Sequence, residues 1–174
     1  MVIEGFGIQV RQLQQAHLPL LRQWRNSEYV RRHMQYREHI TEQMQQQWFS
    51  SLVASNSYYF MIHNGENYVG CCNIKNIDPV SGIGEGGVFF GEERYARGLE
   101  CTKAAFLVYD WAFSNNIFLG VKAEILADNR PALRFNQMLG FEIAPAVNGV
   151  SHGQLCEDNF RKAYHRYAKV FGAQ

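Results

Sequence analysis

The chain has 174 residues, and its 17 lysine and arginine residues nearly balance its 16 aspartate and glutamate residues, for a formal net charge of +1. This balance gives no overall field that would attract nucleic acid or a membrane surface, so neither is expected as a partner. The length fits one domain over residues 1–174 with its own hydrophobic core.

The cysteines and the apolar runs argue against disulfide-rich, metal-binding, secreted and membrane proteins. Cys71, Cys72, Cys101 and Cys156 form no paired ladder, which predicts neither a disulfide framework nor a metal site. The first residues lack the basic region and apolar core of a secretion signal. The apolar run over 104–113 is too short to span a bilayer and contains a charged residue. We therefore expect no membrane segment and a cytoplasmic location.

Short helices are expected near the start of the chain, after one strand. Alternation of apolar and polar residues over 6–11 predicts the strand, and apolar residues at helical spacing predict a helix from Ala16 to Ser27. A second short helix is expected over 29–34. Thr41 is placed to cap a longer third helix. The apolar side of that helix repeats every four residues, at Met44, Trp48 and Leu52.

The middle of the chain predicts an antiparallel meander. Residues 58–63 are aromatic and β-favouring, and the Asn64-Gly65 pair that follows suits a tight hairpin turn. A return strand is expected over 68–77. The turn-forming residues 78–82 then lead to a third strand over 84–90.

A helix, a strand and a second helix are expected next. Cys101, Ala104, Ala105, Val108, Trp111 and Ala112 form an apolar stripe at helical spacing, which predicts a helix ending near Ser114. Residues 120–126 suit a strand. Asn129 is placed to cap the following helix and Gly140 to end it.

The last quarter of the chain gives weaker patterns. We expect a strand over 141–144, a loop over 147–153 and a final strand over 163–171, whose alternation is imperfect. No element is assigned to 157–162. No repeat or low-complexity tract divides the chain, so the sequence predicts one mixed α/β domain.

Residues 87–105 concentrate the features of an anion-binding site. An apolar strand runs into a basic, glycine-containing turn that opens directly into a helix. Such a junction leaves backbone N–H groups unpaired at the positive end of the helix dipole, with Arg94 and Arg97 beside them. A phosphate-binding site is one interpretation. An ordinary strand-to-helix connection with solvated arginines is the other.

The order of elements resembles the GNAT superfamily of acyl-CoA-dependent N-acyltransferases. Two motifs support this resemblance: the strand from Glu85 followed by Tyr95-Ala-Arg-Gly-Leu-Glu100, and the Asn129 helix ending in Leu-Gly-Phe141. The resemblance covers nearly the whole chain. It implies a mostly antiparallel, twisted sheet of about six to seven strands with helices on both faces.

A narrower resemblance concerns the front of the chain. Trp24-Arg-Asn26, Met34, and His39-Ile-Thr41 leading to Trp48 are similar to the branch of ribosomal-protein N-terminal and amino-sugar-nucleotide acetyltransferases. Among these, the pattern looks most like the N-acetyltransferases of pseudaminic acid synthesis.

The sequence departs from the family pattern at three positions. Tyr95 stands where the loop usually begins with Gln or Arg, and Glu100 stands where Gly or Ala is usual. Asn136 occupies the position of the tyrosine that protonates the departing thiolate in many relatives. Asparagine can hydrogen-bond a thiolate, but it is not a useful general acid near neutral pH.

The resemblance implies acetyl-CoA as cosubstrate and no metal. The pyrophosphate is expected at the loop and helix start, and the pantetheine arm beside the end of the strand. The residues implied in acetyl-CoA binding are Val88, Phe89, Phe90, Arg94, Tyr95, Arg97, Gly98, Leu99, Glu100, Cys101, Asn129, Ala132 and Phe135.

Direct transfer requires a base, because an alkylamine is mostly protonated near neutral pH. Glu85 is the first candidate, and His39 and Glu38 are weaker ones. The simpler interpretations are a solvated carboxylate for Glu85 and a structural histidine near a helix cap for His39. Tyr164 and Tyr167 are alternative acids.

The acceptor pocket is expected among the early helices, with Arg25, Asn26, Met34 and Tyr36 as its candidate residues, although a core position is favoured for Met34. The leading hypothesis is an acetyltransferase acting on a small or nucleotide-linked amine, such as an amino sugar, as a monomer or homodimer. Peptide N-terminal acetylation and a non-catalytic acyl-CoA sensor are the alternatives.

Overall fold

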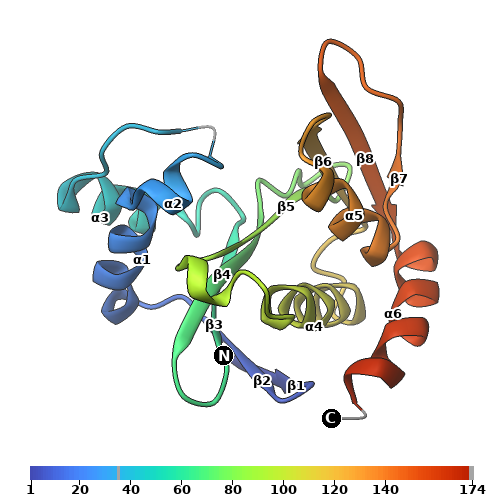
Figure 1. Cartoon of the computed structure of the whole chain (residues 1–174), viewed down its shortest axis with the longest axis horizontal. Coiled ribbons are helices and arrows are strands. Elements are labelled where there is room, and N and C mark those ends of the chain that lie inside the picture. The colour runs from blue at the N-terminus through green and yellow to red at the C-terminus, as the bar shows by residue number, and fades with distance from the viewer. Residues whose placement is uncertain (35, 173–174) are drawn as a thin grey trace.

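The structure is a computed structural model that describes residues 1–34 and 36–172. Within these residues the fold is built around one eight-stranded sheet, in which the strands follow the order β1-β2-β3-β4-β5-β6-β8-β7 (Figure 1). The strands are β1 (Val2–Gly5), β2 (Ile8–Gln12), β3 (Tyr58–His63), β4 (Tyr68–Lys75), β5 (Ile83–Phe90), β6 (Gly120–Leu126), β7 (Glu142–Ile143) and β8 (Val150–Cys156). The α-helices are α1 (Leu18–Asn26), α2 (Glu28–Arg31), α3 (Glu42–Ser51), α4 (Glu100–Ser114), α5 (Arg130–Leu139) and α6 (Glu157–Phe171). Two 3₁₀ turns, η1 (Gln15–His17) and η2 (Glu93–Tyr95), precede α1 and α4.

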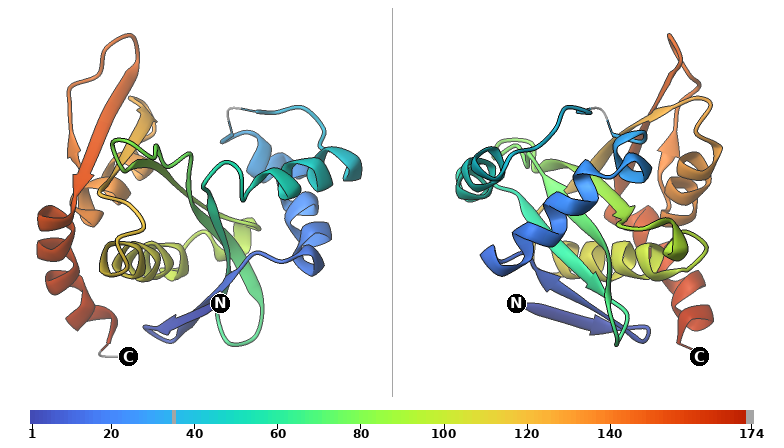
Figure 2. Two further views of the ribbon diagram at one scale, coloured as in Figure 1. Left: turned by 180° about the vertical axis from the view of Figure 1, so that it is seen from behind. Right: turned by 60° about the vertical axis from the view of Figure 1, so that its left-hand side comes forward.

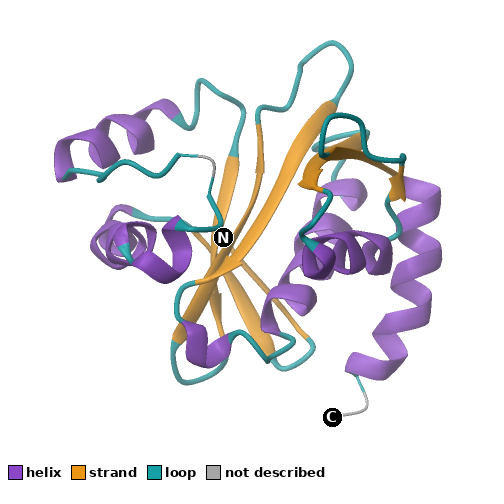
Figure 3. Ribbon diagram, turned by 45° about the horizontal axis from the view of Figure 1, so that its top comes forward, coloured by secondary structure: helices purple, strands orange, loops and turns teal. Residues whose placement is uncertain are grey.

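The sheet is antiparallel except at one place. β3, β4 and β5 form the predicted meander, and its first turn contains Gly65 at a φ of +99°. β5 and β6 pair in parallel, because α4 connects them and returns the chain to the same end of the sheet. Figure 3 shows the twist of the whole sheet. The fold class predicted from the sequence is confirmed, with eight strands instead of six to seven.

The first strand was missed because its hairpin was not recognised. β1 pairs with β2 in antiparallel register, and Phe6 and Gly7 between them both have positive φ angles of 52° and 74°. Two successive left-handed residues form the tight turn that suits a two-residue hairpin. Phe6 therefore lies in the turn, and β2 begins at Ile8.

The predicted helix caps are confirmed. The Thr41 side chain accepts a hydrogen bond from the Met44 backbone N–H at 3.2 Å, and Asn129 does the same for Ala132 at 3.2 Å. Gly140 ends α5 at a φ of +98°. On the predicted apolar side of α3, Leu52 is buried and Trp48 packs against the core, but Met44 is 39% exposed and Gln45 is buried in its place.

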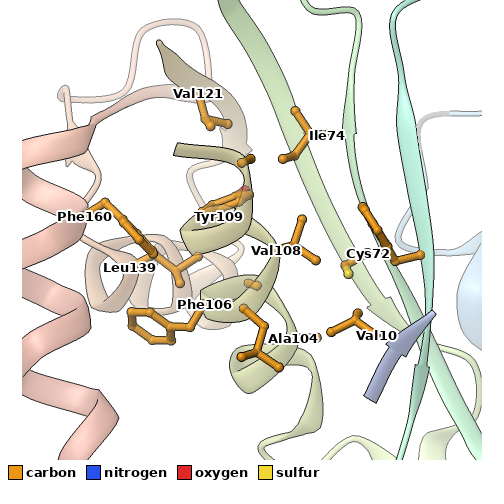
Figure 4. Close-up of a cluster of buried hydrophobic side chains, with 14 of the residues drawn as sticks. Val10, Cys72, Ile74, Ala104, Phe106, Val108, Tyr109, Val121, Leu139 and Phe160 are labelled. Carbon is orange, nitrogen blue, oxygen red and sulfur yellow. The ribbon is translucent and has the colours of Figure 1, made fainter. Parts of the chain in front are cut away.

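Helices cover both faces of the sheet (Figures 1 and 2). α1, α2 and α3 pack on one face around Leu18, Trp24 and Met61. α4, α5 and α6 pack on the other face over the larger core. Figure 4 shows Val10, Cys72 and Ile74 of the sheet against α4, with Leu139 and Phe160 beyond it. α4 is nearly enclosed because it is buried between the sheet and α6.

The C-terminal predictions were partly wrong. Residues 150–153 belong to β8 instead of a loop, and the expected strand over 163–171 is the second half of α6. The apolar residues that pack against the core, Phe160, Ala163, Tyr164, Tyr167 and Phe171, follow helical spacing when 157–162 is included. Residues 163–171 alone are too few to reveal this helical period.

Candidate active site

β5 and β6 separate after three paired residues. Ile83, Gly84 and Glu85 pair with residues 120–122, whereas β5 continues to Phe90 and β6 to Leu126. Beyond Glu85, β4 is the one strand partner of β5 among the residues that the structure describes. Beyond Glu85, the edge of β5 that faces β6 therefore offers backbone N–H and C=O groups to an extended ligand.

Tyr109 lies beneath the point of separation. A Cβ atom on Gly86 would overlap the Tyr109 hydroxyl and would lie 3.1 Å from Val121 Cγ1. Burial raises the pKa of Tyr109, which keeps its hydroxyl protonated. The sequence reasoning did not single out Tyr109, and the Gly86-Gly87 pair above it was the available signal.

The start of α4 has no side-chain cap. Leu99 occupies the N-cap position without a capping bond, whereas Thr41 and Asn129 cap α3 and α5. The Lys103 backbone N–H donates to the Leu99 carbonyl at 2.8 Å, as the first α-helical bond of α4. The amides of residues 100–102 thus have no acceptor within the helix, and they lie at the positive end of its dipole. This arrangement suits a phosphate.

Glu100 covers this amide cluster. Its carboxylate bends back over Gly98, so that a Cβ atom on Gly98 would overlap Glu100 Oε2. Oε2 is buried without a hydrogen-bond partner. The negative charge is favourable beside the helix start, but it occupies the place where a phosphate would be held.

The two arginines of the basic loop before α4 differ in their contacts. Arg94 pairs with Glu92 at 2.9 Å and lies 4.7 Å above the ring of Tyr95, whereas Arg97 is exposed. Cys101 is buried, and burial raises the pKa of its thiol well above the usual value. It is therefore a packing residue in its present environment.

Glu85 lies at the end of the paired part of β5, on the α1–α3 face. Lys75 approaches its carboxylate at 3.3 Å and Lys122 at 3.7 Å. The Asn76 side chain donates to the same group at 3.5 Å. To accept a proton from an amine, Glu85 would have to exchange one of these partners.

The predicted acceptor residues are distributed unevenly. Met34 lines a small pocket together with Tyr29, Val30 and His33 of the α2 region and residues 88–90 of β5. Tyr36 and His39 are exposed on the segment before α3. The catalytic role suggested for His39 stays a prediction.

Asn26 and Arg25 differ in their hydrogen bonding. The Asn26 amide donates to the Ile40 carbonyl at 2.9 Å and accepts from the Ile40 N–H at 2.8 Å, which holds the segment before α3 against α1. The Arg25 Nε atom is buried without a partner, and so is the Oδ1 atom of Asn73 on β4. Asn73 was not predicted; a polar residue between Cys72 and Ile74 was the available signal.

The candidates on α5 and α6 also occupy defined positions. The Asn136 side chain donates to the Ala132 carbonyl at 2.8 Å, and Phe135 packs against the larger core. Tyr164 and Tyr167 pack against Phe106, with ring centroids 6.1 Å and 5.8 Å away. As residues of a core-facing helix, these two tyrosines have a packing role that the sequence reasoning did not foresee.

Residues 1–34 and 36–172 contain no group of three or more His, Cys, Asp or Glu side chains that could hold a metal ion. None of the helices described within these ranges is long and apolar enough to cross a membrane.

A parallel strand pair that opens toward an uncapped, basic helix start offers backbone groups suited to an extended ligand and, at the helix, to an anion. The family model of the acetyltransferase (GNAT) domain matches residues 8–142. The chain belongs to this family, and it is a GNAT-type acetyltransferase. Members of the family use acetyl-CoA.

Solved structures agree with this fold. RimL, the ribosomal L7/L12 alpha-N-protein acetyltransferase in complex with coenzyme A, has a TM-score of 0.77 at 13% identity, over 91% of this chain and 99% of that chain. Spermidine N-acetyltransferase from Vibrio cholerae, with CoA and spermine, has a TM-score of 0.76 at 13% identity, over 90% and 99%.

A GCN5-related N-acetyltransferase from Brucella melitensis has a TM-score of 0.76 at 18% identity, over 98% of this chain and 85% of that chain. At these identities the likeness concerns the fold alone. No curated protein sequence matches the chain.

Proposed function

We propose that this protein transfers the acetyl group of acetyl-CoA directly to a primary amine of a small or nucleotide-linked acceptor, such as an amino sugar. The observation that carries the proposal is the opening between β5 and β6, which lies in the same strand-loop-helix unit as the uncapped start of α4. The uncapped amides at the start of α4 suit a phosphate. The carboxylate of Glu100 occupies the space above Gly98, so phosphate binding there requires this side chain to move.

In the proposed reaction, the amine nitrogen attacks the thioester carbon, an N–C bond forms and the C–S bond breaks. The amine loses one proton, and the departing thiolate gains one. Backbone N–H groups on the free edge of β5, from Gly86 to Phe90, are fixed donors for the thioester oxygen as it becomes negative. One such donor lowers a barrier by roughly 3–4 kcal/mol.

Glu85 is the proposed base, since it lies where β5 and β6 separate. A proton moving from the ammonium to its carboxylate would displace one of its lysine partners. The second N–H of the Asn136 amide, beyond the one donated to Ala132, is the proposed donor to the thiolate. The proton that finally neutralises the thiolate then comes from solvent.

The front of the chain supports a finer proposal within the family. Its resemblance to amino-sugar-nucleotide acetyltransferases, including those of pseudaminic acid synthesis, agrees with a partly buried arginine, Arg25, on the acceptor side. Peptide N-terminal acetylation is the second candidate, because RimL acts on a ribosomal protein and has the same fold. A non-catalytic acyl-CoA sensor is the third, favoured by Glu100 and by the asparagine at 136.

Release of free thiol from acetyl-CoA with amino sugars, peptides and polyamines tests the proposal. Gly98→Trp should abolish acetyl-CoA binding by filling the space above the α4 amides. Val80→Trp is the matched control, because Val80 is 93% exposed in the turn between β4 and β5. Binding without turnover of any amine would support the sensor. Unchanged affinity in a folded Gly98→Trp protein would refute the site.

A further inference from the structure

Two buried polar atoms on the α1–α3 face have no hydrogen-bond partner: Arg25 Nε and Asn73 Oδ1. Leaving a buried donor or acceptor unpaired costs about 1–3 kcal/mol. The first requires a hydrogen-bond acceptor and the second requires a donor. A ligand that carries both groups would recover this cost.

Asn73 lies beside the opening between β5 and β6. It is the cross-strand neighbour of Tyr59 on β3 and of Gly87 on β5. Its amide atoms lie 3.1 Å and 3.2 Å from the position that a Cβ atom on Gly87 would occupy. Gly87 follows Glu85 by two residues, so Asn73 and Glu85 face the same side of the sheet.

Arg25 approaches the same region from α1. Burial raises the pKa of Tyr59 to about 12, and the positive charge of Arg25 opposes that rise. Arg25 likewise opposes the effect of burial on the pKa of Cys71, the next residue but one from Asn73 on β4. The ring of Trp48 from α3 packs edge-on against Tyr59 at 4.9 Å. Arg25 and Asn73 therefore both lie near Tyr59 on the α1–α3 face, and we refer to these three residues as the polar cluster.

The charges around this cluster are predominantly positive. Lys75 and Lys122 both pair with the single carboxylate of Glu85, and Arg25 adds a third cation. A polyamine would place further positive charge beside these groups, which is unfavourable. A monoamine avoids this additional repulsion, and an oxygen near its amine adds an acceptor for the Arg25 guanidinium.

We propose that Asn73 positions the acceptor amine and that Arg25 selects amines that carry an oxygen group close to the reacting nitrogen, an inference that rests on the proposed acetyl transfer. Asn73 Oδ1 accepts an N–H of the amine above Gly87 and positions it on the side of Glu85. The Arg25 guanidinium donates to a hydroxyl, carbonyl, carboxylate or phosphate oxygen of the same molecule. Amino sugars, amino acid amides and peptide N-termini share this chemistry, and polyamines lack it.

The test compares kcat/KM for glucosamine and glycinamide with that for cyclohexylamine and spermidine. The oxygen-bearing amines should be preferred by at least about tenfold, which corresponds to about 1.4 kcal/mol. Arg25→Gln should reduce the preference to about twofold or less. Arg22→Gln should keep it, because Arg22 lies one turn earlier on α1 and pairs with Glu42 at 3.5 Å, outside the cluster.

Asn73→Leu should raise KM for all four amines and leave acetyl-CoA affinity unchanged, and Asn73→Ser should restore part of the loss. If Asn73→Leu does not fold, the comparison is made between Asn73→Ser and the unmodified protein. A preference for spermidine, or an unchanged preference in Arg25→Gln, would overturn this inference and leave the proposed function intact. Turnover of none of the amines would overturn both.

Discussion

Glu100→Gln should tighten acetyl-CoA binding. The carboxylate of Glu100 bends over Gly98, in the space expected for the pyrophosphate, and one of its oxygens is buried without a partner. Acetyl-CoA must therefore push this charge aside or bind beside it. The amide of glutamine keeps the shape and removes the charge.

The size of the effect follows from electrostatics. Two unit charges about 5 Å apart repel by about 0.8 kcal/mol in bulk water and by about 3 kcal/mol at an effective dielectric constant of 20. The loop is largely exposed at Arg97 and Gly98, which places the effect near the lower value. A gain of about 1–2 kcal/mol corresponds to roughly 5- to 30-fold tighter binding.

Isothermal titration calorimetry with acetyl-CoA measures this change at low and high salt. Glu100→Ala separates charge from bulk, because it also removes the side chain above Gly98. Glu66→Gln, in the exposed β3–β4 hairpin, is the control for net charge. Both Glu100 variants should lose a few tenths of a kcal/mol of stability, since the helix dipole favours an acid at this position. Equal or weaker binding by Glu100→Gln would refute the placement of the phosphates.

Three further predictions concern catalysis, packing and pH. Glu85→Gln should lower kcat by about 10²- to 10⁴-fold and remove the acidic limb of the pH–rate profile, and an unaltered profile would exclude Glu85 as the base. Gly70→Ala should lower the free energy of unfolding by about 2–3 kcal/mol in denaturant, because the added Cβ overlaps the Phe89 carbonyl oxygen. A smaller decrease than that caused by Gly153→Ala would contradict the close strand contact. Burial, with the charge of Arg11, lowers the pKa of His17 in the folded protein below 6.5. Between that lowered pKa and 6.5 the unfolded chain binds more protons than the folded chain, so the stability of the fold rises with pH over this interval. His17→Asn should flatten this part of the curve of Tm against pH, and an equally steep curve would show that His17 does not contribute.

The order of most elements could be predicted from the sequence because their signals are local. Asn64-Gly65, Thr41, Asn129 and Gly140 each set a turn or helix end by their own backbone and side-chain chemistry, and the structure has each where it was expected. The C-terminal helix was mistaken for a strand because its buried face becomes clear only over all fifteen residues from Glu157. The period of a short apolar segment does not distinguish the two.

The site was predictable only where one segment forms it. Residues 87–105 lie consecutively along a strand, loop and helix, so their arrangement follows from local structure. Asn73, Tyr59 and Arg25 come from three elements, and their proximity depends on strand register and on the docking of α1. The lysine partners of Glu85 were missed for the same reason, since they lie on β4 and β6.

Mass spectrometry of the acceptor after incubation with trideuteroacetyl-CoA tests the central claim most directly. An amine bearing one trideuteroacetyl group should form in proportion to the thiol released, and Gly98→Trp should abolish both while Val80→Trp retains them. Thiol release without acetylated amine would indicate hydrolysis of the thioester. That result, or transfer that continues in a folded Gly98→Trp protein, would contradict direct transfer at the opening between β5 and β6.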